Sequence, residues 1–284
     1  MLSSPPEAGP YVVQCMEIWG GNEAVDQALS MTGIDAWVYS RPLAGHASGG
    51  DVHYVSMCGG GKIVRFALMD VAGHGGSASD LAAKLRALMR KHINRLNQAG
   101  FAAALNREFT ALGGGQFATA LLTSYFAPTD QLVVLNAGHP PPLWYRAAVR
   151  AWGFLEPQAP GHLRRLGNIP LGIIEPTEFE QFAVQLGPGD LVLIYTDALI
   201  ESASTDGELL GSDGLLELAG RIDPSRPHEF CKRLVEAACS GPDRKPADDD
   251  LTLILLLHTA TDPPERSLGD TMKVIARMLG LVKV

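Results

Sequence analysis

Apolar residues change their spacing several times along this chain, and each spacing predicts a different element. Short runs rich in apolar and β-branched residues predict strands at 11–18, 36–40, 51–57, 62–71, 117–126, 131–135, 143–150, 179–186, 191–196 and 251–257. Helical spacing of Leu81, Leu85, Met89, Ile93 and Leu96 predicts a helix, with Ser77 or Ser79 as its N-cap. Further helices are expected at 101–112, 212–220 and 227–239.

The order of these elements indicates an α+β fold. Strands grouped in hairpins, with helices inserted in pairs, predict two packed antiparallel sheets flanked by helices, an α/β/β/α sandwich, and disfavour a parallel βαβ sheet. We expect one domain over 11–258, preceded by a flexible tail at 1–10. Residues 259–284 are expected to form a linker and a short amphipathic helix that docks on its own domain.

Composition narrows the classes of function. The chain has 284 residues, of which 46% are hydrophobic and 19% charged, which suits a packed globular domain. A net charge of −8 without a run of Lys or Arg argues against nucleic acid or a membrane as partner. Four cysteines without C-x-x-C spacing, and no signal peptide, predict free thiols and a cytoplasmic location.

Aspartates at the ends of apolar runs are the main chemical feature of the sequence. Asp70 ends the run that begins at Phe66, Asp197 ends the run that begins at Leu191, and Asp51 opens the strand that follows it. Asp248, Asp249 and Asp250 directly precede the last strand. A single aspartate in such a place is usually a turn residue or an N-cap, but converging carboxylates repel one another unless a cation lies between them.

The residues themselves favour a hard divalent cation. Carboxylate oxygens select Mg²⁺ or Mn²⁺ over zinc, and no Cys/His cluster competes for the metal. Two such ions bridged by one aspartate can hold a hydroxide in line with a phosphoryl group and neutralise the charge that develops on it.

Several motifs, taken in order, resemble those of PPM-type (type 2C) metal-dependent protein phosphatases. They are 48–51 (SGGD), 69–75 (MDVAGHG), 136–142 (NAGHPPP), 188–197 (PGDLVLIYTD) and 249–252 (DDLT), and they are most similar to the SpoIIE/RsbU branch. Each motif alone is weakly specific, whereas the ordered set over roughly 36–258 is highly specific.

The resemblance implies a role for each matching residue. Asp70 would bridge two Mn²⁺ or Mg²⁺ ions, and the backbone carbonyl of Val71 would bind one of them. Asp197 and Asp249 would hold the other ion, with Asp248 and Asp250 as competitors for the role of Asp249. Asp51 would hold metal-bound water or ligate directly. A hydroxide between the ions would be the nucleophile.

Some residues depart from the pattern of the branch. Ala198 stands where the branch usually has Gly, and Tyr54 stands where an acidic residue is common. We expect the methyl group of Ala198 to crowd the turn behind Asp197 and weaken metal binding. His74 is interpreted as a turn residue, and His139 either as a turn residue or as a group that supports the metal ligands from behind. In the stretch before Asp51, Arg41 and His46 are the only candidates for binding phosphate through a side chain. The metals are therefore expected to bind the phosphate largely alone.

Two classes of function remain open. The first is a protein serine/threonine phosphatase in a bacterial partner-switching pathway, whose phosphoprotein substrate the resemblance suggests to be a STAS-domain anti-anti-sigma factor. The second is a catalytically weak domain that binds a partner and signals without turnover, for which Ala198 and Tyr54 are the only indications. A different carboxylate metallohydrolase is a distant third. A homodimer is left open by the sequence.

Overall fold

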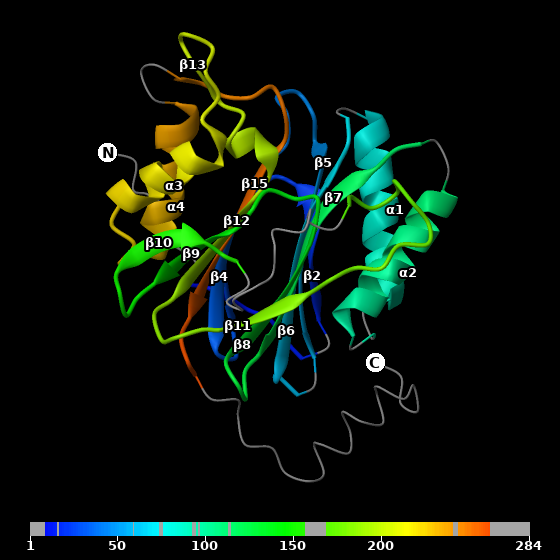
Figure 1. The fold of residues 1–284 in the computed structure, drawn as a ribbon, viewed down its shortest axis with the longest axis horizontal. Coiled ribbons are helices and arrows are strands. Elements are labelled where there is room, and N and C mark those ends of the chain that lie inside the picture. Colours follow the sequence, from blue (N-terminus) through cyan, green and yellow to red (C-terminus); the bar gives the residue numbers. More distant parts are fainter. Residues whose placement is uncertain are drawn as a thin grey trace.

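Two β-sheets lie face to face at the centre of the molecule, and a pair of helices covers the outer face of each sheet (Figure 1). The computed structural model describes residues 9–15, 17–58, 60–73, 76–92, 95, 97–112, 115–156, 169–240 and 244–261. The predicted α/β/β/α sandwich is therefore confirmed.

The first sheet has seven strands in the order β1-β3-β4-β15-β12-β9-β10. Their bounds are β1 Tyr11–Val12, β3 Val25–Met31, β4 Ile34–Arg41, β15 Leu251–His258, β12 Leu191–Tyr195, β9 Leu143–Arg146 and β10 Ala151–Phe154. All neighbours are antiparallel except β1, which runs parallel to β3. Helices α3 (Gly211–Arg221) and α4 (Pro227–Cys239) cover its outer face.

The second sheet has six antiparallel strands in the order β11-β8-β7-β6-β5-β2. Their bounds are β11 Phe182–Gln185, β8 Gln131–Ala137, β7 Ala118–Phe126, β6 Ile63–Val71, β5 Ser48–Cys58 and β2 Ile18–Glu23. Helices α1 (Gly76–His92) and α2 (Gln98–Ala111) pack on its outer face. A two-stranded ribbon, β13 (Ala203–Ser204) with β14 (Arg244–Lys245), lies outside both sheets.

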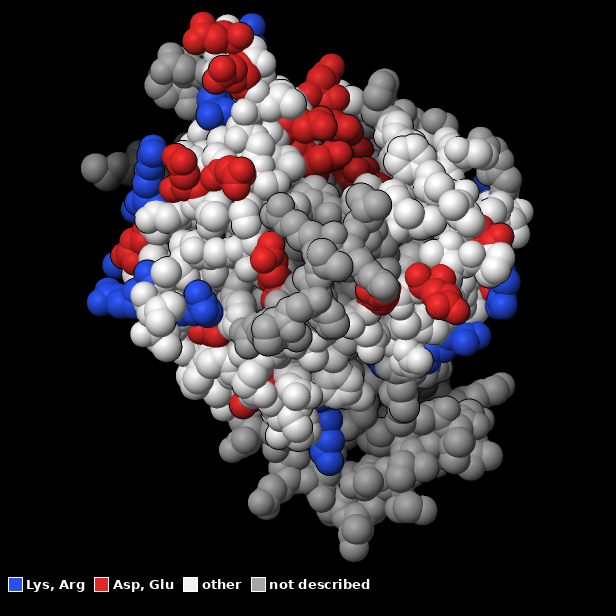
Figure 2. Space-filling view, viewed as in Figure 1, with Lys and Arg blue, Asp and Glu red and all other residues white. Residues whose placement is uncertain are grey.

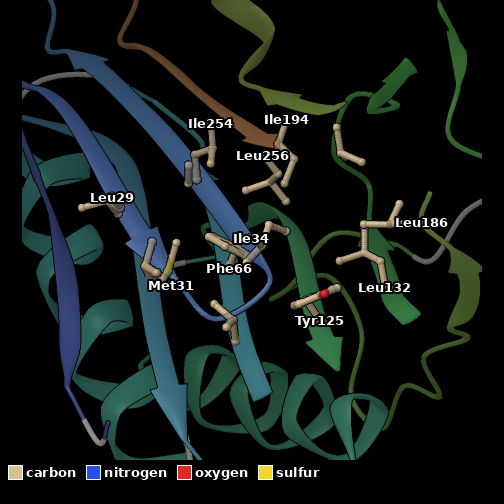
Figure 3. Close-up of a cluster of buried hydrophobic side chains, with 14 of the residues drawn as sticks. Leu29, Met31, Ile34, Phe66, Tyr125, Leu132, Leu186, Ile194, Ile254 and Leu256 are labelled. Atoms are coloured by element: carbon tan, nitrogen blue, oxygen red, sulfur yellow. The ribbon is translucent and has the colours of Figure 1, made fainter. Parts of the chain in front are cut away.

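Three apolar clusters hold these four layers together. The first lies between the sheets, and Figure 3 shows side chains from both, such as Phe66 and Ile254, directed toward one another. The second lies under α1 and α2, and the third lies under α3 and α4. Each central strand therefore buries both faces, and in β6 the side chains of Phe66 and Leu68 enter the first cluster while those of Ala67 and Met69 enter the second.

Some predicted boundaries were wrong. The expected strand at 11–18 is two short pieces, β1 and the start of β2. The expected strand at 143–150 contains β9 and the turn after it, and β10 was missed. Strand β3 was missed because its sequence, VDQALSM, carries polar residues on the face that is not covered by the core. Neither Ser77 nor Ser79 caps α1, since the helix already begins at Gly76.

Among the described residues, no helix combines the length and the apolar character needed to cross a membrane. The amphipathic segment expected near the C-terminus lies outside the described residues, which end at 261.

Candidate active site

Two carboxylates face each other across neighbouring strands. Asp51 on β5 pairs directly with Asp70 on β6 in the antiparallel register. Strand alternation turns both side chains toward the space between the sheets, because Val55 and Phe66, an even number of residues away, enter the first cluster. The prediction that Asp51 opens a strand was wrong, since β5 begins at Ser48 and Asp51 lies inside it.

Two more carboxylates come from the opposite sheet to the same end of the sandwich as Asp51 and Asp70. Asp197 follows β12 and begins a short 3₁₀ helix, Asp197–Leu199, and Asp249 lies just before β15. The hydroxyl of Thr196 donates to Asp51 Oδ2 at 3.0 Å, which joins the two sheets directly at the carboxylates. Figure 2 shows acidic side chains gathered in a patch near the ends of β5 and β15.

Burial and mutual repulsion disfavour ionisation of this group. Burial, followed by the charges of Asp197 and Asp249, raises the pKa of Asp70 to about 7. Asp51 is 2% exposed, and burial together with the charge of Asp70 raises its pKa well above the ordinary value. Hydrogen bonds from Thr252 and Thr196 oppose that rise. Burial and the nearby Glu201 raise the pKa of Asp197 as well.

The donor set fits a hard divalent cation. Asp51 Oδ1 is buried without a hydrogen-bond partner, although an unpaired buried carboxylate oxygen is costly. Raised pKa values across several carboxylates show that positive charge is lacking at this edge, and a cation would supply it. As they stand, no three His, Cys, Asp or Glu side chains of the described residues are arranged to hold one ion.

The three consecutive aspartates have different surroundings. Asp250 is 5% exposed, and its two oxygens accept the backbone N–H groups of Leu43 and Gly50, both at 2.6 Å. Its carboxylate also lies against Gly49, where a Cβ atom would come within 2.5 Å of it. Asp250 thus holds the Gly49–Gly50 segment of β5 in place through a hydrogen bond and close packing. Asp248 is exposed, whereas Asp249 is half-buried and its charge contributes to the raised pKa of Asp70.

The backbone carbonyl of Val71 lies close to this same segment. A Cβ atom on Gly50 would stand 3.2 Å from that carbonyl oxygen and 3.4 Å from the methyl group of Ala78, at the start of α1. A side chain at position 50 would therefore press on the backbone next to Asp70. The glycine pair keeps strand β5, the end of β6 and helix α1 close together at the carboxylates.

The two departures from the family pattern, Ala198 and Tyr54, are both buried in apolar clusters. Ala198 lies in the 3₁₀ helix, is not among the residues with positive φ, and buries its methyl group in the third cluster, so the backbone accepts this residue without the strain of a positive φ. A weakening of metal binding by its methyl group stays a prediction. Tyr54 belongs to the second cluster, on the face of β5 opposite to Asp51. An acidic residue at position 54 would point toward α1 and away from Asp51.

The histidines and arginines near the carboxylate motifs have different surroundings. His139 donates its backbone N–H to Asn136 Oδ1, and its carbonyl accepts from Asn136 Nδ2, which makes the expected turn. Its ring Nδ1 pairs with Thr119 Oγ1 at 2.8 Å, and burial lowers its pKa to about 3, so the ring is neutral. Arg41 and His46 are exposed. His74 lies outside the described residues.

Sequence analysis missed three contributors to the site. Glu201 follows Asp197 by four residues, one helical turn, and its charge raises the pKa of both Asp197 and Asp70. Thr196 directly follows β12 and Thr252 lies on β15, and both keep the alternation that directs Ile194 and Ile254 between the sheets. The alternation of β12 and β15 was the available signal for both threonines.

Comparison with known proteins identifies the family. The model of the Stage II sporulation protein E (SpoIIE) family matches residues 60–259, well over half of the chain. The phosphoserine phosphatase RsbP of Bacillus subtilis (strain 168) is 24% identical over 144 residues, which cover 49% of this chain and 33% of RsbP. The chain thus matches about a third of the length of that curated relative.

Solved structures agree with this match. The RsbU and RsbW domains of Rv1364c from Mycobacterium tuberculosis superpose with a TM-score of 0.68 at 26% identity, covering 88% of this chain and 69% of that one. The PP2C phosphatase domain of SpoIIE from Bacillus subtilis, solved with a fragment of its regulatory domain, gives a TM-score of 0.65 at 17% identity, covering 85% and 70%. The chain therefore belongs to the SpoIIE family and has the fold of its PP2C-type protein phosphatase domains.

Proposed function

We propose that this domain removes phosphate from phosphoserine or phosphothreonine of a protein substrate, with two Mn²⁺ or Mg²⁺ ions as cofactors. The observation that carries the proposal is the buried, facing pair of Asp51 and Asp70, whose pKa values are raised and which includes an oxygen without a partner. Membership in a family of phosphatase domains supports the same reaction.

Each carboxylate has a role in this proposal. Asp70 would be shared by both ions, with the carbonyl of Val71 as a further ligand beside it. Asp197 and Asp249 would hold one ion from the opposite sheet, and Asp51 would ligate or hold water beside the pair. When bound, the ions would neutralise the charge on the phosphoryl group and lower the pKa of water so that it attacks at neutral pH.

Hydrogen bonds from neighbouring residues orient these ligands. Thr196 donates to Asp51 Oδ2 and so fixes one oxygen of Asp51 while leaving Oδ1 available. Asp250 keeps the Gly49–Gly50 segment against β15. A pKa of about 7 means that Asp70 carries a proton in part of the molecules at neutral pH, and this proton must leave its carboxyl group when an ion binds. Ion affinity is therefore expected to rise with pH.

The substrate and its setting are also part of the proposal. RsbP is named a phosphoserine phosphatase, and Rv1364c carries RsbU and RsbW domains in one chain, so we assign a phosphorylated partner-switching protein, such as a STAS-domain anti-anti-sigma factor, as substrate. All four cysteines are free thiols, in keeping with a cytoplasmic location. A homodimer is compatible with this function.

Turnover of a phosphate ester and of a phosphoserine protein, measured with Mn²⁺, with Mg²⁺ and with excess chelator, tests the proposal. We expect activity only with an added ion, and none in Asp70→Asn. Asp248→Asn removes an exposed neighbouring charge and is the matched control, with activity retained. Full activity in chelator would refute the metal requirement. A folded protein that is inactive with every divalent ion would instead favour the binding-module alternative.

A further inference from the structure

Exposed apolar side chains gather beside the carboxylates. Leu112 is the C-cap of α2, Phe117 directly precedes β7, and Ile173 and Ile174 lie in the segment that leads to β11. These four side chains, which are 43%, 38%, 49% and 55% exposed, form the apolar patch. Figure 2 shows few charged side chains to the right of the acidic patch, on the side of the molecule where Figure 1 places α1 and α2. A contiguous apolar surface of this kind marks a site for a binding partner.

Three segments of the chain meet at the apolar patch. A Cβ atom on Gly172 would stand 3.0 Å from the ring of Phe109, which lies about one helical turn before Leu112. It would also stand 2.7 Å from the carbonyl oxygen of Gln116, directly before Phe117. The residue before the two isoleucines therefore contacts both the end of α2 and the start of β7, which brings the four side chains together.

Hydrogen bonds fix the two isoleucines in their outward position. Leu171 is fully buried and pairs with the first residue of β7 through two backbone hydrogen bonds of 2.8 and 2.9 Å. Asn106 on α2, which is 1% exposed, accepts the N–H of Gly172 at 2.8 Å and donates to the carbonyl of Ile174 at 2.7 Å. Because the backbone is held on both sides of Ile173, little conformational entropy is lost when a partner covers it.

Strand β7 connects the apolar patch with the carboxylates. Asp70 lies opposite Thr119 in the β6–β7 register, and the carbonyl of Phe117 accepts the N–H of Ala72 at 2.9 Å. Phe117 thus stands two residues from the partner of Asp70, about 7 Å along the strand. A folded protein that brings a phosphoserine to Asp70 is wide enough to contact the patch as well, whereas a small phosphate ester is not.

Acidic side chains border the apolar patch. Glu175 and Glu178 follow the two isoleucines closely and are exposed. Two copies of the patch would bring these acidic borders together, and like charges across an interface are unfavourable. The net charge of −8 opposes self-association in the same way. A complementary partner therefore presents apolar side chains bordered by Lys or Arg.

We propose that the apolar patch docks the protein substrate, whose phosphoserine lies beside apolar side chains with a basic border. This inference rests on the proposed phosphatase function and names the surface that selects the substrate. A surface that contacts the substrate equally before and during the reaction acts on KM and leaves kcat unchanged. Turnover of a small ester depends on the carboxylates and their ions alone.

Steady-state kinetics with two substrates test the docking, with p-nitrophenyl phosphate as the small ester and a STAS-domain protein phosphorylated on serine as the folded substrate. In the double variant Ile173→Ser, Ile174→Ser, we expect KM for the phosphoprotein to rise at least about tenfold, with kcat and both constants for the ester unchanged. Val149→Ser removes a side chain that is 60% exposed in the β9–β10 turn and is the matched control, unchanged with both substrates. Glu178→Lys is expected to raise KM for the phosphoprotein at low salt only.

Four results would overturn the docking proposal and leave the proposed function standing, as long as the unmodified protein hydrolyses the ester with Mn²⁺. The double variant could lose activity equally toward both substrates, because the isoleucines then support the carboxylates, or it could keep its kinetics toward both. It could change its oligomeric state in sedimentation, because the patch then binds a second copy. The unmodified protein could hydrolyse the ester but not the phosphoprotein. An unmodified protein without activity toward either substrate would overturn both proposals.

Discussion

Asp70→Asn is expected to stabilise the metal-free protein at about pH 8 while it abolishes turnover. The pKa of Asp70 is about 7 in the fold, against an ordinary value of 3.8. An acid whose pKa is raised by folding costs no stability below its unfolded pKa. The cost grows as pH rises from the unfolded to the folded pKa and is constant above that.

The size of the effect follows from this shift. About three pKa units correspond to roughly 4 kcal/mol of destabilisation at about pH 8. Asparagine cannot ionise and removes this cost, but its partly buried amide must find new partners, at about 1–3 kcal/mol. The net gain is roughly 1–3 kcal/mol, or about 2–10 °C in Tm for a domain of this size.

Melting curves in chelator at about pH 8 and about pH 4 measure the effect, since the gain should be present at the higher pH and absent at the lower one. Added Mn²⁺ should raise Tm strongly in the unmodified protein and much less in Asp70→Asn. Asp248→Asn, which removes a solvated charge, should behave as the unmodified protein. A Tm at high pH that is lower in Asp70→Asn than in the unmodified protein would refute the reasoning, because the carboxylate would then stabilise the fold.

Three other substitutions have expected outcomes. Asp250→Ala should lower the free energy of unfolding by about 1–3 kcal/mol for each backbone N–H left unpaired, and therefore lower Tm. An unchanged Tm would contradict the stabilising role of its hydrogen bonds. Ala198→Gly should cost about 0.5–1 kcal/mol without changing the Mn²⁺ concentration for half-maximal activity, and tighter Mn²⁺ binding would support the crowding hypothesis. His139→Ala should lower Tm through the lost contact with Thr119. It should also reduce the loss of stability as the pH falls from 6.5 toward about 3, because in this range the unfolded histidine takes up a proton while the buried one stays neutral. A pH–activity profile near neutrality that shifts in His139→Ala would show that the ring titrates there.

The sandwich could be predicted because its central strands are long and apolar. Strands β6, β7, β12 and β15 were found within a few residues of their true bounds, since burial of both faces makes them continuous apolar runs. Strand β3 lies toward an edge of its sheet and carries polar residues, so its sequence resembles a loop. The strand expected at 143–150 joined β9 to the turn that follows it, because this turn, 147–150, contains neither Gly nor Pro, and β10 was missed.

The candidate site, too, could be predicted from the sequence only in part. The motifs marked Asp51, Asp70, Asp197 and Asp249, which come from both sheets and reach one edge of the sandwich. What each carboxylate contacts could not be predicted, because hydrogen bonds such as Leu43 N–H to Asp250 join segments about 200 residues apart. Only the fold distinguishes Asp250, which accepts backbone hydrogen bonds, from the exposed Asp248 two residues before it.

By itself, the sequence determined the long central strands, the residue types that could carry phosphoryl chemistry, and the family that the chain resembles, since each depends on local order and spacing. Only the tertiary structure decided which carboxylates lie together and that Tyr54 faces away from Asp51. Those facts depend on burial and on the register between strands. Both arise when distant segments pack, and neither is encoded in any single stretch of residues.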